Sequence, residues 1–127
     1  MPFTFDWLDD THTTILIYYP SAFTVEEFLS VTQQINEQIK SVGNPVDLII
    51  DQHDLKQLPP GVISLLRTQA RRSAARHIVI IGMQPLAQGI ARVLSVLGIA
   101  EKMPHYANSV AEAQTVLVEL RQQIKTD

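Results

Sequence analysis

The sequence predicts a single-domain α/β protein over residues 1–127, with a mixed, mostly parallel sheet of about five strands and about four helices in the order ββαβαβαβα. Three observations lead to this fold class. Short apolar segments typical of strands alternate with longer segments whose apolar residues recur at helical spacing. The connections are short, which favours right-handed crossovers that place helices against a central sheet. The length suits one domain, and a hydrophobic fraction of 46% is enough for one continuous core.

The first two elements are expected to form an antiparallel hairpin. From Phe3 to Leu8, an aromatic residue occupies every second position, a period that suits a half-buried strand. Asp9 and Asp10 then provide a short acidic turn. The segment HTTILIYYP, residues 12–20, is rich in β-branched and aromatic residues and stops at a proline, so it is expected to be the second strand.

A helix is expected from Thr24 to Val42. Thr24 is followed three residues later by Glu27, which is the pattern of a capping box. Gly43 and the asparagine after it favour the left-handed conformation that ends many helices, and Pro45 prevents the helix from continuing.

The rest of the chain repeats a strand-and-helix alternation. VDLIID, residues 46–51, is nearly all apolar, as expected of a strand that helices cover on both faces. The later elements that we expect are a helix over 60–75, the strand HIVIIG over 77–82, a helix over 85–97, the strand EKMPHYA over 101–107 and a last helix over about 109–124.

Composition narrows the class of function. A formal net charge of −3 argues against a nucleic-acid-binding protein, which would normally carry a basic excess. The absence of cysteine excludes disulfides, thiolate metal sites and a cysteine nucleophile. The N-terminus has acids where a signal peptide needs basic residues, and no apolar run approaches the roughly 20 residues of a membrane span. We therefore expect a cytoplasmic protein without an integral membrane segment.

Ligands of open α/β sheets bind beyond the carboxyl ends of the strands, so the loop after Asp51 is the first candidate site. Asp51, His53 and Asp54 could form an acid–base group or bind a metal ion. The simpler interpretation is that Asp51 ends its strand by binding loop amides. The other three histidines share no spacing with His53, so we expect neither a metal site nor an enzyme.

Two further segments contain candidate binding residues. GMQPLAQG, residues 82–89, lacks the glycine patterns whose amides bind phosphates, so no nucleotide or other cofactor is expected and Gly82 is interpreted as the end of a strand. The second segment carries two arginine pairs, each spaced by one helical turn. Such a face is either solvated or binds an acidic protein surface or a phosphate; its residues are Arg67, Arg71, Arg72 and Arg76.

The order of features around DLIIDQHDLKQLPPGVISLL resembles the STAS domain, the sulfate transporter and anti-sigma factor antagonist family. A buried strand ends in aspartate and is followed by a loop, a helix, a strand that closes in VIIG and a helix that ends in VLSVLGI. The later segment LGIAEKMPHYANSVAEAQTVL adds the leucine–glycine turn, short strand and final alanine-bearing helix typical of that family. The chain is also similar to the related bacterial SpoIIAA-like group, described as STAS/SEC14-like.

The STAS resemblance implies a regulatory protein-interaction module whose partner is an anti-sigma-type kinase or another regulator. In phosphorylatable members an aspartate–serine pair leads into the helix, and these positions fall on Pro59 and Pro60 here, so the usual phosphorylation switch is expected to be missing. The expected binding surface consists of Asp51, His53, Asp54, Leu55, Pro59, Pro60, Gly61, Arg67 and Arg71.

Further expectations concern an apolar ligand, a homodimer and the conformation of Pro60. The SEC14-like resemblance implies, as an alternative function, a small carrier or sensor of an apolar ligand; its motivation is a helical apolar set that could equally be core, namely Ile90, Val93, Leu94, Val96 and Leu97. The aromatic residues of the first strand could cover the core or pair in a homodimer. Pro60 is expected in the first turn of its helix, which would leave the amides of Val62 and Ile63 free to bind an acidic group.

Overall fold

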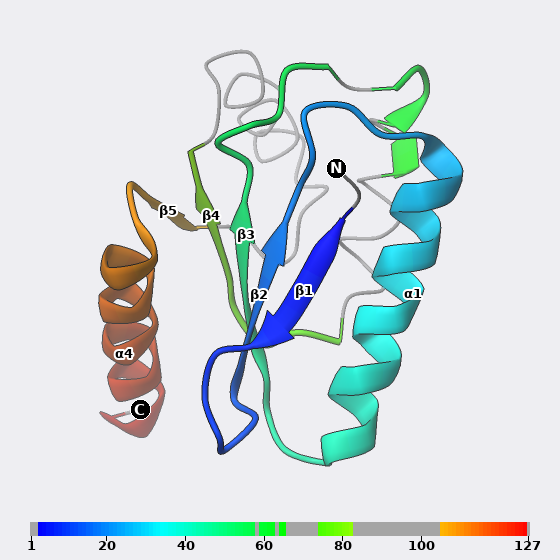
Figure 1. Cartoon of the computed structure of the whole chain (residues 1–127). Coiled ribbons are helices and arrows are strands. Elements are labelled where there is room, and N and C mark those ends of the chain that lie inside the picture. The colour runs from blue at the N-terminus through cyan, green and yellow to red at the C-terminus, as the bar shows by residue number, and fades with distance from the viewer. Residues whose placement is uncertain (1–2, 58, 63, 66–73, 83–104, 127) are drawn as a thin grey trace.

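The computed structural model describes residues 3–57, 59–62, 64–65, 74–82 and 105–126 (Figure 1). Within these residues the chain forms five strands and two long helices. In chain order they are β1 (Thr4–Trp7), β2 (Thr14–Tyr18), α1 (Val25–Val42), β3 (Asp47–Asp51), β4 (Ile78–Ile81), β5 (His105–Ala107) and α4 (Val110–Thr126).

The five strands form one mixed sheet in the order β1-β2-β3-β4-β5. β1 and β2 pair antiparallel, and the other three neighbouring pairs are parallel. Ile49 at the centre of β3 lies opposite Leu16 of β2 and Val79 of β4. The α/β class, the hairpin and the mostly parallel sheet of five strands are therefore confirmed.

Helix α1 begins and ends where its local sequence signals place it. The Thr24 hydroxyl accepts a hydrogen bond from the Glu27 amide, and the Glu27 carboxylate accepts one from the Thr24 amide, each at 3.1 Å. Gly43 adopts a left-handed conformation with φ of 70° directly after the last helical residue. The capping box and the glycine stop are thus both confirmed.

The two helices cover opposite faces of the sheet (Figure 1). Four residues of α1, spaced by three or four positions, are buried against the hairpin side of the core: Phe28, Val31, Ile35 and Ile39. On the other face, Ala113 and Leu117 of α4 pack with Ile49 and Val79. β3 lies between both layers, which explains why its sequence is apolar without alternation.

Part of the expected helix content differs or lies outside the described residues. Val62, Ser64 and Leu65 are helical, but the helix expected over 60–75 does not extend to its last two residues. The Ala74 amide binds the Asn36 side chain at 3.2 Å instead, because this segment already connects to β4. The helix expected over 85–97 lies outside the described residues, so the order with four helices is not confirmed.

Candidate functional site

Strands β2, β3 and β4 end side by side, and their carboxyl ends bring together the first group of candidate residues. Asp51 is the last residue of β3, and its Oδ1 accepts a hydrogen bond from the His53 amide at 3.1 Å. Asp51 therefore shapes the loop that follows, as the simpler sequence interpretation proposed. We call Tyr18, Asp51, His53 and Asp54 the His53 cluster.

The imidazole of His53 lies between two carboxylates. Its Nδ1 binds Asp51 Oδ1, and its Nε2 lies 3.3 Å from Asp54 Oδ1. The hydrogen bond to Asp51, followed by the charge of Asp51, raises the pKa of His53 above its ordinary value. Since 56% of the side chain is exposed, the cluster presents to solvent an imidazole ring that two carboxylates hold in place.

Tyr18 completes the cluster and was not identified from the sequence. Its hydroxyl donates a hydrogen bond to Asp54 Oδ2, and this bond raises the pKa of Tyr18. Tyr18 is the last residue of β2 and lies opposite Asp51 in the parallel register. A comparison of residues at the ends of neighbouring strands would have been the signal that finds it.

Gly82 allows the chain after β4 to approach the His53 backbone closely. Its φ is 70°, and a Cβ placed on it would lie 2.6 Å from the His53 Cβ and 2.9 Å from the His53 nitrogen. A side chain here would therefore be strained by conformation and by contact. The interpretation of Gly82 as the end of its strand is confirmed.

The loop after the cluster is held to the rest of the molecule by its backbone. The Lys56 and Gln57 amides donate to the Ser21 carbonyl at 2.9 and 3.1 Å. The side chain of Leu55, a candidate binding residue, is buried and packs in the core on the α1 side. The loop consequently presents the side chains of His53, Lys56 and Gln57 to solvent from a fixed backbone.

Pro59, Pro60 and Gly61 form a turn ahead of the next helix. The Val62 amide donates to the Pro59 carbonyl at 3.2 Å, and Gly61 has a φ of 80°. Proline in the second position and a glycine of positive φ in the third are typical of a type II turn. Pro60 is therefore not in the first helical turn and the Val62 amide is not free, so both expectations were wrong. Ile63 lies outside the described residues.

Of the four arginines in the arginine-rich segment, only Arg76 lies among the described residues. Arg67, Arg71 and Arg72 lie outside the described residues. Arg76 follows the helix instead of belonging to it, and its guanidinium faces Asp47 at the amino end of β3. Arg76 thus belongs to a second cluster, which lies at the amino end of β3, whereas the His53 cluster lies at its carboxyl end.

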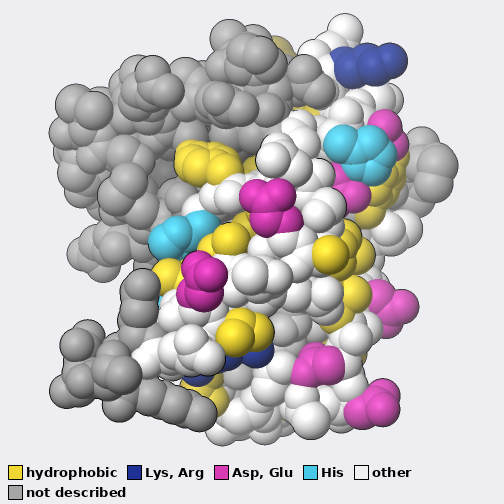
Figure 2. All heavy atoms as spheres, turned by 90° about the vertical axis from the view of Figure 1, so that its left-hand side faces the viewer, with side chains coloured by type: hydrophobic (Ala, Val, Ile, Leu, Met, Phe, Trp, Pro, Cys, Tyr) yellow, Lys and Arg dark blue, Asp and Glu magenta, His cyan; other side chains and the backbone are white. Residues whose placement is uncertain are grey.

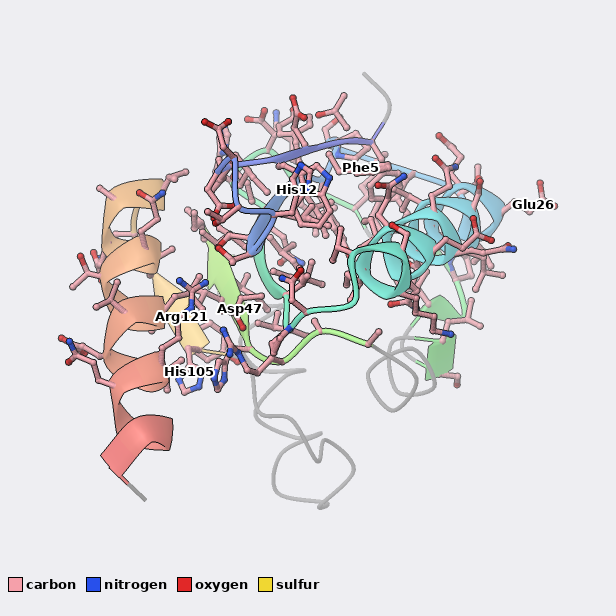
Figure 3. All side chains as sticks on the ribbon, turned by 90° about the horizontal axis from the view of Figure 1, so that it is seen from below. Phe5, His12, Glu26, Asp47, His105 and Arg121 are labelled. Atoms are coloured by element: carbon pink, nitrogen blue, oxygen red, sulfur yellow. The ribbon has the colours of Figure 1, made fainter. Side chains whose placement is uncertain are left out.

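Asp47 is fully buried and is paired with two arginines. Arg76 Nη2 and Arg121 Nη2 lie 2.9 and 2.6 Å from its Oδ2, and the His77 amide donates to its Oδ1 at 3.0 Å. Burial alone would raise the pKa of Asp47, but the hydrogen bonds from both arginines outweigh it and lower that pKa. Figure 3 shows Asp47 and Arg121 together between the sheet and α4. This cluster joins β3, β4 and α4.

The described residues limit the chemistry that these clusters can support. Within them, no group of three histidine, cysteine, aspartate or glutamate side chains is placed to hold a metal ion. None of the helices in this part of the chain is long and apolar enough to cross a membrane.

On the α4 side, acidic and hydrophobic side chains are scattered, and lysine and arginine cover little of the described surface (Figure 2). The apolar set that motivated a lipid carrier, residues 90–97, lies outside the described residues.

Comparison with known proteins supports the fold-level resemblance. No family model and no curated protein matches the sequence. Among solved structures, the chain is similar to the anti-sigma factor antagonist SpoIIAA in its unphosphorylated form, with a TM-score of 0.60 and 12% sequence identity. The match covers 92% of this chain and 97% of the other. The resemblance drawn from the sequence is thereby confirmed for the fold, and the chain has a fold similar to that of the anti-sigma factor antagonist SpoIIAA.

Proposed function

We propose that this chain is a non-catalytic regulatory module that binds another protein through the loop over residues 51–57 and the turn over Pro59–Gly61. The main support is that this loop follows the carboxyl end of β3 in a SpoIIAA-like sheet, faces solvent, and is held by hydrogen bonds of its backbone. Ligands of open α/β folds bind at this edge. The partner that the resemblance favours is an anti-sigma-type kinase or another soluble regulator in the cytoplasm.

The geometry of the His53 cluster supports binding over catalysis. A general base needs a ring nitrogen with a free lone pair within reach of a substrate proton. Both nitrogens of His53 face carboxylates, and Asp54 also accepts the hydrogen bond of Tyr18. The two carboxylates therefore hold the ring in place, and its exposed face is available for contact with the partner.

The turn supports a module that does not depend on serine phosphorylation at the helix entrance. By the STAS resemblance, the family's aspartate and serine fall on Pro59 and Pro60, and neither has a hydroxyl. Pro60 and Gly61 are exposed in a turn closed by the Val62 amide. We infer that the surface is permanently in its binding-competent form.

A pair of charge reversals tests this proposal. Lys56→Glu changes an exposed side chain on the loop, whereas Lys40→Glu makes the same change on the last turn of α1. Both variants and the wild type, immobilised at equal density, are exposed to native lysate, and bound proteins are quantified by mass spectrometry. A partner enriched by the wild type and by Lys40→Glu, but depleted with Lys56→Glu, is expected. Equal capture by all three proteins, or no enriched protein, would contradict the proposal.

A further inference from the structure

Strand β1 forms an edge of the sheet, and among the described residues it pairs only with β2. The Leu8 amide donates to the Thr14 carbonyl at 2.9 Å, so Leu8 directs its backbone groups toward β2. Backbone groups alternate in direction along an antiparallel strand, which means that Phe5 and Trp7 direct theirs away from β2. The outward Trp7 amide is bound by the Asp6 carboxylate at 3.1 Å, whereas the Phe5 amide and carbonyl face the side of β1 on which no described strand lies.

A groove of about 370 Å³ runs beside this edge, between β1 and the amino-terminal half of α1. Its apolar part consists of Phe3, Phe5 and Val31. The first two of these also pack against the core, which confirms the expectation that the aromatic residues of β1 can cover it. The polar part comes entirely from α1 and consists of Glu26, Glu27, Ser30 and Gln34.

The charge of the groove is negative. The Glu27 carboxylate is engaged by the Thr24 amide, and the exposed Glu26 extends outward from α1 (Figure 3). No lysine or arginine is among the described residues that line the groove. A long side chain with an aliphatic stem and a cationic end would pack its stem on Phe5 and bring its charge to Glu26.

We propose that β1 is a docking edge for an extended, basic segment of another protein. The segment pairs with the outward backbone groups of Phe5 as an added strand, and every second side chain, lysine or arginine, lies in the groove. A second copy of this chain is a poor occupant, because the groove of each copy carries Glu26 and Glu27, and β1 has no lysine or arginine to place beside them. This surface is separate from the loop of the proposed function and can succeed or fail independently.

A short acetylated peptide of alternating valine and lysine is the probe for this surface. Its binding to the full chain is measured by fluorescence anisotropy and mapped by amide chemical shifts. We expect the largest shifts at Phe5 and at the start of α1, with no binding of a valine–glutamate peptide of equal length. Methylation of alternate backbone nitrogens of the probe removes donors that an added strand needs, so the methylated peptide is expected to bind much more weakly.

Two variants separate the groove from general acidity. Glu26→Gln is expected to weaken binding about two- to fivefold, the range of an exposed ion pair, while Glu37→Gln, an exposed position further along α1, leaves it unchanged. Equal loss in both variants, undiminished binding of the methylated peptide, or shifts confined to residues 51–61 would overturn the proposal. Concentration-dependent dimerisation with shifts at Phe5 would overturn it in favour of a second copy.

Discussion

Replacement of Gly82 by alanine tests how closely β4 approaches the His53 loop. Gly82 has a left-handed φ of 70°, a conformation that costs a residue with a Cβ about 1–2 kcal/mol. The added Cβ would also lie 2.6–2.9 Å from backbone and Cβ atoms of His53, and overpacking of this kind typically costs about 1–3 kcal/mol. The two effects together predict a loss of about 2–5 kcal/mol in the free energy of unfolding.

Gly43 is the matched control, because its φ is also 70° but an added Cβ would meet no atom within 4 Å. Gly43→Ala should therefore lose only the conformational part, about 1–2 kcal/mol. Denaturant unfolding followed by circular dichroism measures both values, and amide shifts show whether the loop at His53 moves in the Gly82 variant. Equal losses for the two variants, with His53 shifts unchanged, would refute the close approach.

Three more predictions follow from the clusters and the helix cap. The pKa of His53, measured by NMR titration, should lie above its ordinary value and should fall in Asp51→Asn. His53 therefore contributes its full stability at pH values below its ordinary pKa, and this contribution is lost as the pH rises through the raised pKa. Asp47→Asn should cost about 3 kcal/mol, since it leaves two arginines without their carboxylate. Because the pKa of Asp47 is lowered in the folded protein, Asp47 contributes its full stability at pH values above the pKa of an unfolded aspartate. This contribution is lost as the pH falls through the lowered pKa, so the stability of Asp47→Asn should depend less on pH in acid. Thr24→Ala should reduce stability by about 1 kcal/mol in chemical denaturation, because it removes the cap of α1; a loss near zero would contradict the capping box.

The parts of the fold that were predicted correctly depend on signals within a few residues. The capping box at Thr24 and the glycine stop at Gly43 fix α1 locally, and the apolar run of β3 reflects its position between two layers. Pro60 was placed wrongly because proline favours both the first turn of a helix and the second position of a β-turn. The positive φ of Gly61, which proline patterns alone do not reveal, decides in favour of a turn.

The side-chain clusters depend on contacts between distant residues, which periodicity does not encode. Asp51, His53 and Asp54 are close in sequence and were found, whereas Tyr18 meets them only through strand pairing. Arg76 was assigned to a helix face because its spacing fits one, but Asp47 lies 29 positions away in sequence and pairs with it. The aspartate at the start of an otherwise apolar strand was the available signal for a buried ion pair.

We propose above all that a protein partner binds the loop over residues 51–57, at the carboxyl ends of the strands. Amide chemical shifts of the labelled chain, recorded while the captured partner is added, test it most directly. We predict that the largest changes occur at His53, Lys56, Gln57 and Gly61, and that the exposed face of α4 around Gln114 and Val118 stays unchanged. Changes centred on α4, with the loop unaffected, would contradict the account.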